Sequence, residues 1–523
     1  MNWKKFREAF KETGADEAHF ILGIDLGNVT STIAYFDKIS QSAEVIDISG
    51  GYGKANVPSA LQYAADSKEW IFGEYAILNA NGADALLRRF VEKLGGRGYL
   101  DIGANPMAVV DVAAVFLKEL VGSCRSINPK AQIAGIIAVV PSYYPAEARD
   151  EIERVFRICG LERVLIEIYS DRECVLHHYF GEVGEISDER VMVLDYGARE
   201  FRAHVFDISK NSGNVKALCQ ASLFDSDLGC DKIDGDVYEF FAEHYCKASN
   251  TERDRLQNTA KEQLFTFTHQ HKDMLFAKGA GLVRLYYNFI YPPFSANVNE
   301  QQIDDLVTPH SRGIEKFLSD VMEKAGSSSP AHMPDTVILS GGGFEMLWAR
   351  RLIARLYPQA NILSPKNPKG IMAQGAARIA AGHLELVPLI EIDMIDYHKI
   401  PWDIGVMIQK DGQSRFYPII EGGSFWWQRH APVSFILKDE VRGANPVEID
   451  FYMRDNGGNM ASISRVTLAD LPTRPPGTTK LAIDLVSTSQ EDFVVNITDV
   501  GFGEMFPSSG LRKEFAINIS TQV

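Results

Sequence analysis

An internal repeat constrains the fold of this chain more than any other feature of its sequence. Residues 20–37 (FILGIDLGNVTSTIAYFD) and 190–207 (RVMVLDYGAREFRAHVFD) align without a gap as apolar strand, Asp-x-Gly turn, second strand and Asp. Each copy predicts a β-hairpin. A third glycine turn, residues 340–345 (SGGGFE), lies between a predicted strand and a predicted helix. Glycine lets backbone N–H groups approach a phosphate and a carboxylate can hold Mg²⁺ through water, so the three turns together indicate a phosphate site.

The pattern of apolar residues divides the chain into an α/β part and an all-β part. From residue 20 to residue 384, short apolar runs alternate with amphipathic stretches, which is typical of α/β architecture. The two repeat copies divide this part into lobes at 20–190 and 191–384. Residues 401–523 show period-two runs separated by Gly- and Pro-rich turns, which predicts a separate β domain.

Two shorter segments flank these parts. Residues 385–400 are apolar and acidic, contain one proline and show no helical stripe, so we expect an extended interdomain linker that can dock on a neighbour. Residues 1–19 predict an N-terminal helical extension with Trp3, Phe6 and Phe10 on one face.

Composition excludes several classes of function. Lys plus Arg number 53 against 69 Asp plus Glu, and the net charge of −16 disfavours nucleic acid and anionic membranes as partners. No apolar run approaches the roughly 18 residues of a membrane span. The six cysteines show no metal-binding spacing and the N-terminus has no apolar signal region, so we expect a cytoplasmic protein.

The three turns resemble the phosphate-one, phosphate-two and adenosine motifs of the actin-like ATPase superfamily, and specifically of the 70-kDa heat-shock chaperones. Further segments along the chain also resemble motifs of that family: VPS at 57–59, IFGE at 71–74, VVPSYY at 139–144, residues 169–179, DLGCD at 227–231, Ala260-Lys261, residues 367–377 and RPPG at 474–477. The resemblance implies a two-lobed actin-like (ribonuclease H-like) ATPase domain followed by a β-sandwich like the family's substrate-binding domain. It also implies an ATP-binding chaperone that binds unfolded or extended polypeptide under the control of nucleotide, with co-chaperones as further partners.

The same resemblance assigns roles to individual residues. Asp25 and Asp195 would hold Mg²⁺ through water, and Asp171, Asp195 and Asn28 would act in ATP hydrolysis. Residues at the three turns and on one helix would contact ATP or ADP: Gly27, Asn28, Val29, Gly197, Ala198, Arg199, Lys261, Gly341, Gly342 and Gly343. The residues alone leave two other interpretations open, because Asp171 after Ser170 also suits a helix start and Lys261 also suits a solvated surface.

Several departures from the family's motifs predict slow hydrolysis at most. The first turn has Asn28 and Val29 where the family has two threonines, and the second turn continues Ala198-Arg199-Glu200 where the family has glycines and a threonine. Side chains therefore occupy a turn that needs close backbone approach. The family's catalytic lysine has three candidate replacements: Arg88, Arg89 and Lys93. On the adenine side, the departures are Asn258, Phe265, Gly343, Glu345 and Lys369.

In the β domain, the resemblance places an extended peptide in a channel of the sandwich, held by its backbone and by one apolar pocket. The positions that match this channel are Tyr417, Ile419, Phe435 and Val447, although each also suits an ordinary sandwich core. Trp426 and Trp427 have no simple counterpart in the family and suit a contact surface. The chain ends at Val523 within a strand-like pattern, so we expect no helical lid.

Two other functions compete with the chaperone hypothesis. The departures at Asn28 and at residues 198–200 favour a nucleotide-binding scaffold or sensor that has lost ATPase activity. A sugar kinase on the same fold is a weaker alternative, because the chain adds a β domain and shows no sugar-site pattern of carboxylates.

Overall fold

The computed structural model comprises two compact units, Met1–Ile395 and Asp396–Val523. The structure describes residues 19–48, 56–64, 66–78, 85–96, 98–102, 105–127, 132–142, 144, 146–183, 185–211, 214–276, 282–288, 293–326, 333–396, 400, 402–410, 412–424, 426, 430–443, 445–455, 458–487 and 492–519. The predicted N-terminal extension lies outside these ranges except for its last residue.

The first unit contains two sheets of the same topology. Strand order is β11-β10-β1-β2-β3 in one sheet, with β4 on β2, and β18-β17-β12-β13-β14-β19 in the other. The first sheet consists of β1 (His19–Asp25), β2 (Thr30–Asp37), β3 (Ser42–Val45), β4 (Asn56–Pro58), β10 (Gln132–Val140) and β11 (Leu165–Ser170). The second consists of β12 (Glu189–Tyr196), β13 (Phe201–Asn211), β14 (Asn214–Asp225), β17 (Thr336–Ser340), β18 (Asn361–Leu363) and β19 (Ile392–Asp396). The repeat seen in the sequence is therefore a duplication of a whole sheet, and the expected mixed α/β organisation is confirmed.

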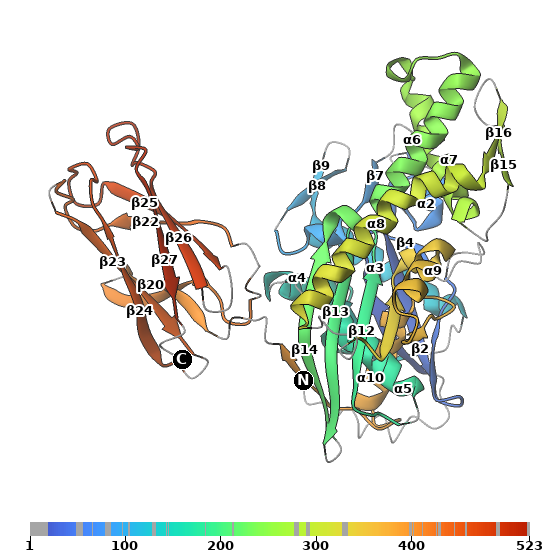
Figure 1. Cartoon of the computed structure of the whole chain (residues 1–523), viewed down its shortest axis with the longest axis horizontal. Coiled ribbons are helices and arrows are strands. Elements are labelled where there is room, and N and C mark those ends of the chain that lie inside the picture. The colour runs from blue at the N-terminus through green and yellow to red at the C-terminus, as the bar shows by residue number, and fades with distance from the viewer. Residues whose placement is uncertain are drawn as a thin grey trace. The chain divides into compact units, whose positions relative to one another are not determined.

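Helices cover both faces of each sheet. They are α3 (Val109–Ile127), α4 (Ala146–Ile158), α5 (Asp171–Glu182), α8 (Glu300–Lys324), α9 (Leu347–Leu356) and α10 (Ile371–His383). One apolar cluster joins α5 and α10 to strands of both sheets, so these two helices lie between the sheets (Figure 1). The outer face of the first sheet packs on α3 and α4, and that of the second on α8 and α9. We call residues 19–183 the N-terminal half and residues 185–383 the C-terminal half of this unit.

Smaller elements extend each half. In the N-terminal half they are β5 (Ala60–Ala64), β6 (Glu69–Phe72), α2 (Glu74–Leu78), β7 (Ala85–Arg88), η1 (Val91–Lys93), β8 (Tyr99–Ile102) and β9 (Asn105–Ala108). In the C-terminal half they are η2 (Ser226–Leu228), α6 (Cys230–Ser249), η3 (Arg253–Arg255), α7 (Asn258–Phe276), β15 (Leu282–Tyr287), β16 (Phe294–Asn299) and η5 (Gly342–Glu345). Helices α6 and α7 and the β15–β16 hairpin share an apolar cluster of their own, and Figure 1 shows α6 and α7 extending away from the two sheets. Among the described helices, none is both long and apolar enough to cross a membrane.

The segment expected to be a linker packs on the first unit. Leu389, Ile390 and Ile392 lie against the cluster around α5 and α10, and the amide of Val215 donates a hydrogen bond of 3.2 Å to the carbonyl of Glu391. Strand β19 then extends the second sheet at β14. The described linker residues up to Ile395 are thus part of the first unit.

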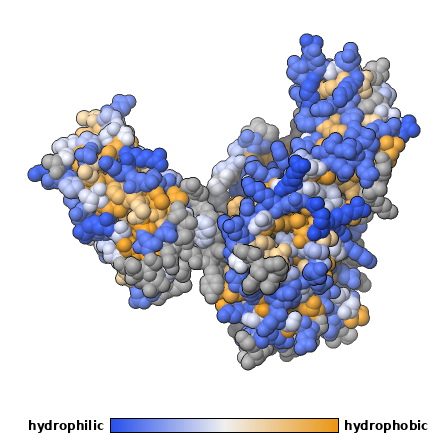
Figure 2. Space-filling view, in the orientation of Figure 1, coloured by the Kyte–Doolittle hydropathy of each residue, from blue (hydrophilic) through white to orange (hydrophobic). Residues whose placement is uncertain are grey.

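The second unit is a β-sandwich. Its sheets have the strand orders β21-β20-β23-β24 and β22-β25-β26-β27, and their facing side chains form one apolar core. The strands are β20 (Asp403–Lys410), β21 (Gln413–Ile420), β22 (Val433–Leu437), β23 (Val447–Arg454), β24 (Met460–Leu468), β25 (Thr479–Ser487), β26 (Asp492–Asp499) and β27 (Arg512–Asn518). Figure 2 shows hydrophobic residues among hydrophilic ones on the visible face of this unit. Trp426 packs partly buried against the core rather than forming an exposed contact surface, and Trp427 lies outside the described residues.

Candidate functional site

The candidate site forms where the duplicated hairpins turn, at the carboxyl ends of parallel strands. Asp25 ends β1 and pairs in register with Thr32 of β2, whereas Asp195 of β12 pairs with Arg202 of β13. In open α/β sheets, ligands bind at these carboxyl ends. The two carboxylates therefore lie where the sequence predicted, but their cross-strand partners differ in charge.

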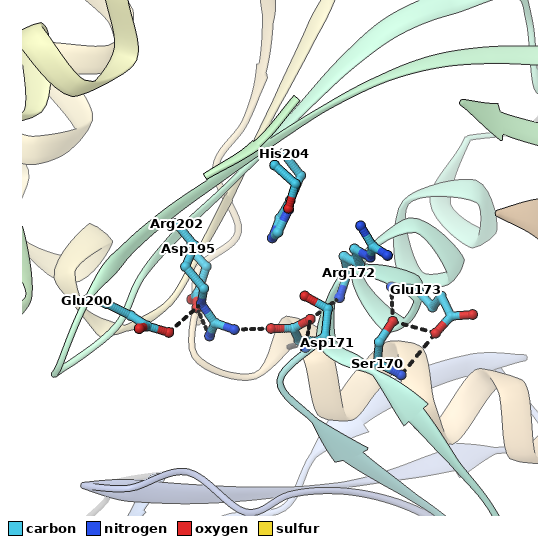
Figure 3. A network of polar contacts seen from close by, with 10 residues as sticks. Ser170, Asp171, Arg172, Glu173, Asp195, Glu200, Arg202 and His204 are labelled. Carbon is cyan, nitrogen blue, oxygen red and sulfur yellow. Dashed lines mark hydrogen bonds and ion pairs between the residues drawn. The ribbon is translucent and has the colours of Figure 1, made fainter. Parts of the chain in front are cut away.

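Arg202 is the centre of a buried polar network (Figure 3). Its Nη1 donates to Asp171 Oδ2 and its Nη2 to Asp195 Oδ2, while its Nε lies 3.4 Å from Glu200 Oε1. The side chains of Asp171, Asp195 and Arg202 are 4%, 6% and 11% exposed. Since Asp171 belongs to the N-terminal half and Arg202 to the C-terminal half, this guanidinium joins the two halves.

The local sequence fixes Asp171 at the start of α5. Ser170 is the N-cap, and a capping box links its hydroxyl and amide to Glu173. Asp171 Oδ1 accepts hydrogen bonds from the amides of Ser142, at 3.0 Å, and of Arg172, at 2.8 Å. Both carboxylate oxygens of Asp171 thus have partners within the protein. The expected helix start is present, but this residue is buried rather than solvated.

Burial and charge shift the titration of these carboxyls in different directions. Burial raises the pKa of Asp25 to about 7, and the negative charge of Asp195 adds to this effect. Burial also raises the pKa of Asp195, since Arg202 offsets only part of it. Burial alone would raise the pKa of Asp171, but the Arg202 guanidinium, the neighbouring His204 and Arg172, and the hydrogen bond from the Arg172 amide together outweigh it and lower that pKa. Of the three carboxyls, Asp171 is therefore the one whose charged form the site stabilises, whereas Asp25 carries a proton for part of the time near pH 7.

Ser59 holds the first turn. Its amide donates to the carbonyl of Val29, at 2.8 Å, and its hydroxyl donates to the carbonyl of Gly27, at 2.6 Å. The Ser59 side chain also bonds to Ser31 Oγ and is fully buried. Asn28 lies on this turn, and its buried Oδ1 has no hydrogen-bond partner among the described residues. The turn is thus fixed from outside and leaves one buried amide oxygen open to a ligand.

The second turn is occupied by the start of α6. The amides of Cys230 and Asp231 donate to the carbonyls of Gly197, at 3.0 Å, and of Ala198, at 2.8 Å. These are amides of the first helical turn, which elsewhere are free to bind an anion. In this protein the first two amides of α6 bind the turn itself, so they do not face a phosphate.

The third turn needs its glycines. Gly341 has φ +88°, and a Cβ there would lie 2.4 Å from Asp195 Oδ1. A Cβ on Gly343 would lie 2.1 Å from the ring of Tyr196. Glu345 on this turn forms an ion pair of 3.2 Å with Lys369, which lies just before α10, so the charges of these two departures from the family's motifs neutralise each other.

Three further contacts join the halves around residues 88–92. Arg89 pairs with Asp231 at 2.6 Å, Glu92 pairs with Arg199 at 2.6 Å, and the Arg88 guanidinium lies 4.6 Å from the ring centre of Phe265. We call these the bridging contacts. Two of the three candidates for the catalytic lysine are therefore engaged across the halves. The third, Lys93, is exposed and has no ion pair among the described residues.

The structure brings together some predicted residues and not others. Asp171 and Asp195 share Arg202, and Gly341 packs directly on Asp195. Lys261 is exposed on α7, and no ion pair holds it within the described ranges. In the second unit, Tyr417 is 39% exposed and its ring meets that of Phe435 edge-on at 5.3 Å.

The other two predicted peptide-binding residues lie deeper in the sandwich. Ile419 is 6% exposed and belongs to the core, while Val447 packs partly buried against it. Tyr417 is therefore the predicted peptide-binding residue that offers the most surface to a ligand.

The site does not fit a divalent metal in the manner the resemblance implies. Asp195 Oδ2 already accepts a hydrogen bond from Arg202, and so does Asp171 Oδ2. Among the described residues, no three His, Cys, Asp or Glu side chains form a group able to hold a metal ion.

Sequence reasoning missed Arg202 and Ser59. The repeat contained the signal for Arg202, because the gap-free alignment places it at the position of Thr32, seven residues after the Asp of each turn. In an antiparallel hairpin that spacing sets it directly opposite Asp195. Ser59 lies within the VPS motif at 57–59, but no local pattern indicates that it holds the first turn.

Two family models match this chain, one within each of its two units. Residues 42–268 match a family described as "Family of unknown function (DUF5716) C-terminal", and residues 399–519 match "Domain of unknown function (DUF8552)". The chain is 24% identical over 505 residues to "Chaperone protein DnaK" of Thermotoga petrophila, covering 94% of this chain and 80% of the relative. It is 21% identical over 499 residues to "Chaperone protein HscA homolog" of Rickettsia bellii, covering 92% and 75%.

A third relative, "Chaperone protein DnaK" of Thermosipho africanus, is 24% identical over 510 residues, covering 94% of this chain and 79% of the relative. The similarity is low but extends over nearly the whole chain and both units. It supports a distant relationship to the 70-kDa heat-shock chaperones.

Proposed function

We propose that this protein is a chaperone-like relative of the 70-kDa heat-shock family that binds unfolded or extended polypeptide through its second unit. The observation that carries the proposal is the similarity to DnaK over 94% of the chain, which includes the β-sandwich. On that sandwich, Tyr417 and Phe435 come from the edge strands β21 and β22 of the two sheets and form a contact with an exposed side. An extended peptide would bind there by its backbone and by one apolar side chain.

Binding of a fluorescent, extended apolar peptide to the full chain tests this part of the proposal. Saturable binding supports it. The matched variants are Tyr417→Asp and Ile436→Asp, because Ile436 is also exposed on β22 but lies on the face opposite Phe435. We expect Tyr417→Asp to weaken binding about 10-fold, a loss of about 1.4 kcal/mol, and Ile436→Asp to leave it within about 2-fold.

We further propose that the first unit accepts ATP or ADP between the three turns. Gly27, Asn28 and Gly341–Gly343 would contact the nucleotide, and Gly197, Ala198 and Arg199 would line the second turn. Linker residues Leu389 and Ile390 pack on the first unit, and through them nucleotide would influence the polypeptide site. The test is calorimetry with ATP and ADP, and no heat with either nucleotide would end this part of the proposal alone.

A specific observation favours the second candidate, a nucleotide-binding scaffold or sensor without turnover. Hydrolysis needs positioned charge around the transferred phosphoryl group, and the carboxylates proposed for that role are paired with Arg202. We therefore expect phosphate release from ATP to be absent or slow. A turnover comparable with the roughly 1–100 s⁻¹ of ordinary phosphoryl-transfer enzymes would reject the scaffold.

A further inference from the structure

The position of Arg202 within the carboxylate cluster has a consequence for the ions that this site can hold. Three carboxylates surround the guanidinium: Asp171 and Asp195 by hydrogen bonds, and Glu200 at 3.4 Å. All four side chains are at most 14% exposed. Charges so deeply buried are stable only when paired, so the guanidinium is a structural requirement of the cluster.

A divalent cation and Arg202 compete for the same oxygens. Mg²⁺ demands nearly ideal octahedral geometry and is held through carboxylates and water. The guanidinium is planar and permanently charged. Because it is attached to β13, it binds the Asp171 and Asp195 oxygens without the loss of translational entropy that a free ion undergoes. An intramolecular cation at this position therefore excludes Mg²⁺ from the two carboxylates.

The first copy of the repeat shows what the second has gained. At the position of Arg202 it has Thr32, whose hydroxyl donates a hydrogen bond of 2.8 Å to Asn56 within the N-terminal half. Arg202 instead extends to Asp171 of the other half. The two hairpins share their backbone register, so Thr32 and Arg202 start from equivalent positions and only the arginine reaches the other half.

We propose that Arg202 is the resident cation of this site: it takes the place of Mg²⁺ between Asp171 and Asp195 and joins the two halves without a divalent metal. This inference rests on the proposed nucleotide binding in one respect: a nucleotide that binds here does so independently of Mg²⁺. A guanidinium has five N–H donors, so a phosphate is able to share Arg202 with the carboxylates.

The first experiment uses the metal alone. The Tm of the full chain is measured in EDTA and in increasing MgCl₂, for the wild type and for Arg202→Gln, Arg202→Lys and Arg190→Gln. Arg190 is the matched control, because it lies in the same hairpin and forms a partly buried ion pair of 2.7 Å with Asp207. We expect no effect of Mg²⁺ on the wild type or on Arg202→Lys, which keeps the charge.

The glutamine variants distinguish the proposal from a general loss of stability. Both lower the Tm, but only Arg202→Gln regains about 3 °C or more with Mg²⁺, because only there do several buried carboxylates lack a counter-ion. Equal recovery in Arg190→Gln, or no recovery in either, would overturn the proposal.

The second experiment measures nucleotide binding. The affinity of the wild type for ADP is expected to change less than about 3-fold between EDTA and Mg²⁺, and Arg202→Gln to gain about 10-fold or more with Mg²⁺. A 10-fold gain with Mg²⁺ in the wild type refutes the inference and leaves the proposed nucleotide binding intact. If the wild type binds no ADP under either condition, the proposed nucleotide binding fails, and the metal experiment alone decides on Arg202.

The wild type also provides a test that needs no folded arginine variant. Mn²⁺ binding to the wild type is measured by electron paramagnetic resonance and compared with that of Asp195→Asn. Equal binding by the two proteins agrees with the proposal. A Mn²⁺ ion that the wild type binds and Asp195→Asn loses contradicts it.

Discussion

The bridging contacts provide a prediction about how firmly residues 85–94 are held against the C-terminal half. The perturbation is the triple variant Arg89→Ala, Arg199→Ala and Phe265→Ala, which removes one partner from each contact. The two ion pairs are partly exposed, with side-chain exposures of 45% and 31% for Arg89 and Asp231 and of 49% and 20% for Arg199 and Glu92. Solvent screening therefore limits each pair to roughly 0.2–1 kcal/mol.

The cation–π contact contributes a similar amount, about 0.5–1 kcal/mol at an exposed site. All three together stabilise the bridged arrangement by about 1–3 kcal/mol, which corresponds to about 5–150-fold in the equilibrium for its opening. Core packing around α5 and α10 is untouched by these changes, so the variant is expected to fold.

Amide hydrogen exchange of residues 85–94 is the assay, because it reports the population of locally opened states. We expect amide exchange of residues 85–94 to accelerate by about 5–150-fold. Arg253→Ala is the control, since it removes an ion pair of 2.8 Å with Glu239 and a cation–π contact with Tyr238, all within the C-terminal half. Unchanged exchange in the triple variant, or an equal acceleration in the control, would refute the assignment of these contacts.

Three more predictions concern stability. In the second unit, burial alone would raise the pKa of Asp499, but Arg474 and the Ser509 and Gly501 amides hold it far below its ordinary value. Arg474→Leu leaves this buried carboxylate without its counter-ion, so we expect it to lower the free energy of unfolding by about 3–5 kcal/mol in chemical denaturation. The stability that Asp499 supplies is complete above about pH 4 and is lost as the pH falls below it. Burial, with added repulsion from Arg378 and His383, lowers the pKa of His177 in the folded protein to about 3. As the pH falls from about 6.5 towards 3, His177 is protonated in the unfolded protein but not in the folded one, so the folded protein loses stability. Between pH 7 and pH 5, the wild type should lose about 2 kcal/mol more than His177→Gln, and equal losses would contradict this assignment. Finally, Gly343→Ala should lower stability by about 1–3 kcal/mol because its Cβ meets Tyr196, whereas Gly235→Ala, which meets nothing within 4 Å, should be neutral or stabilising.

The duplicated hairpins show how far the sequence could predict this fold. Local pattern alone places Asp25 and Asp195 at equivalent turns, because strand alternation and turn glycines depend on neighbours in sequence. The sheet order and the position of β19 beside β14 depend on pairing between segments far apart in the chain. Such pairing is decided by packing of the whole unit, which a single sequence does not display.

The candidate site was predictable to the same limit. The carboxylates and glycines follow from residue type and spacing, whereas the function of Arg202 depends on Asp171, 31 residues away and in the other half. The bridging contacts also depend on partners far away in the sequence, since Arg88 and Arg89 contact residues on α7 and α6. Sequence reasoning could place basic residues near the site but could not show which charges they neutralise.

The most direct test of the central claim is fluorescence anisotropy of a labelled, extended apolar peptide with the full chain and with Tyr417→Asp and Ile436→Asp. We expect saturable binding that Tyr417→Asp weakens about 10-fold and Ile436→Asp leaves nearly unchanged. No saturable binding by the wild type, or equal weakening by both variants, would contradict the claim that the second unit binds extended polypeptide at the Tyr417–Phe435 edge.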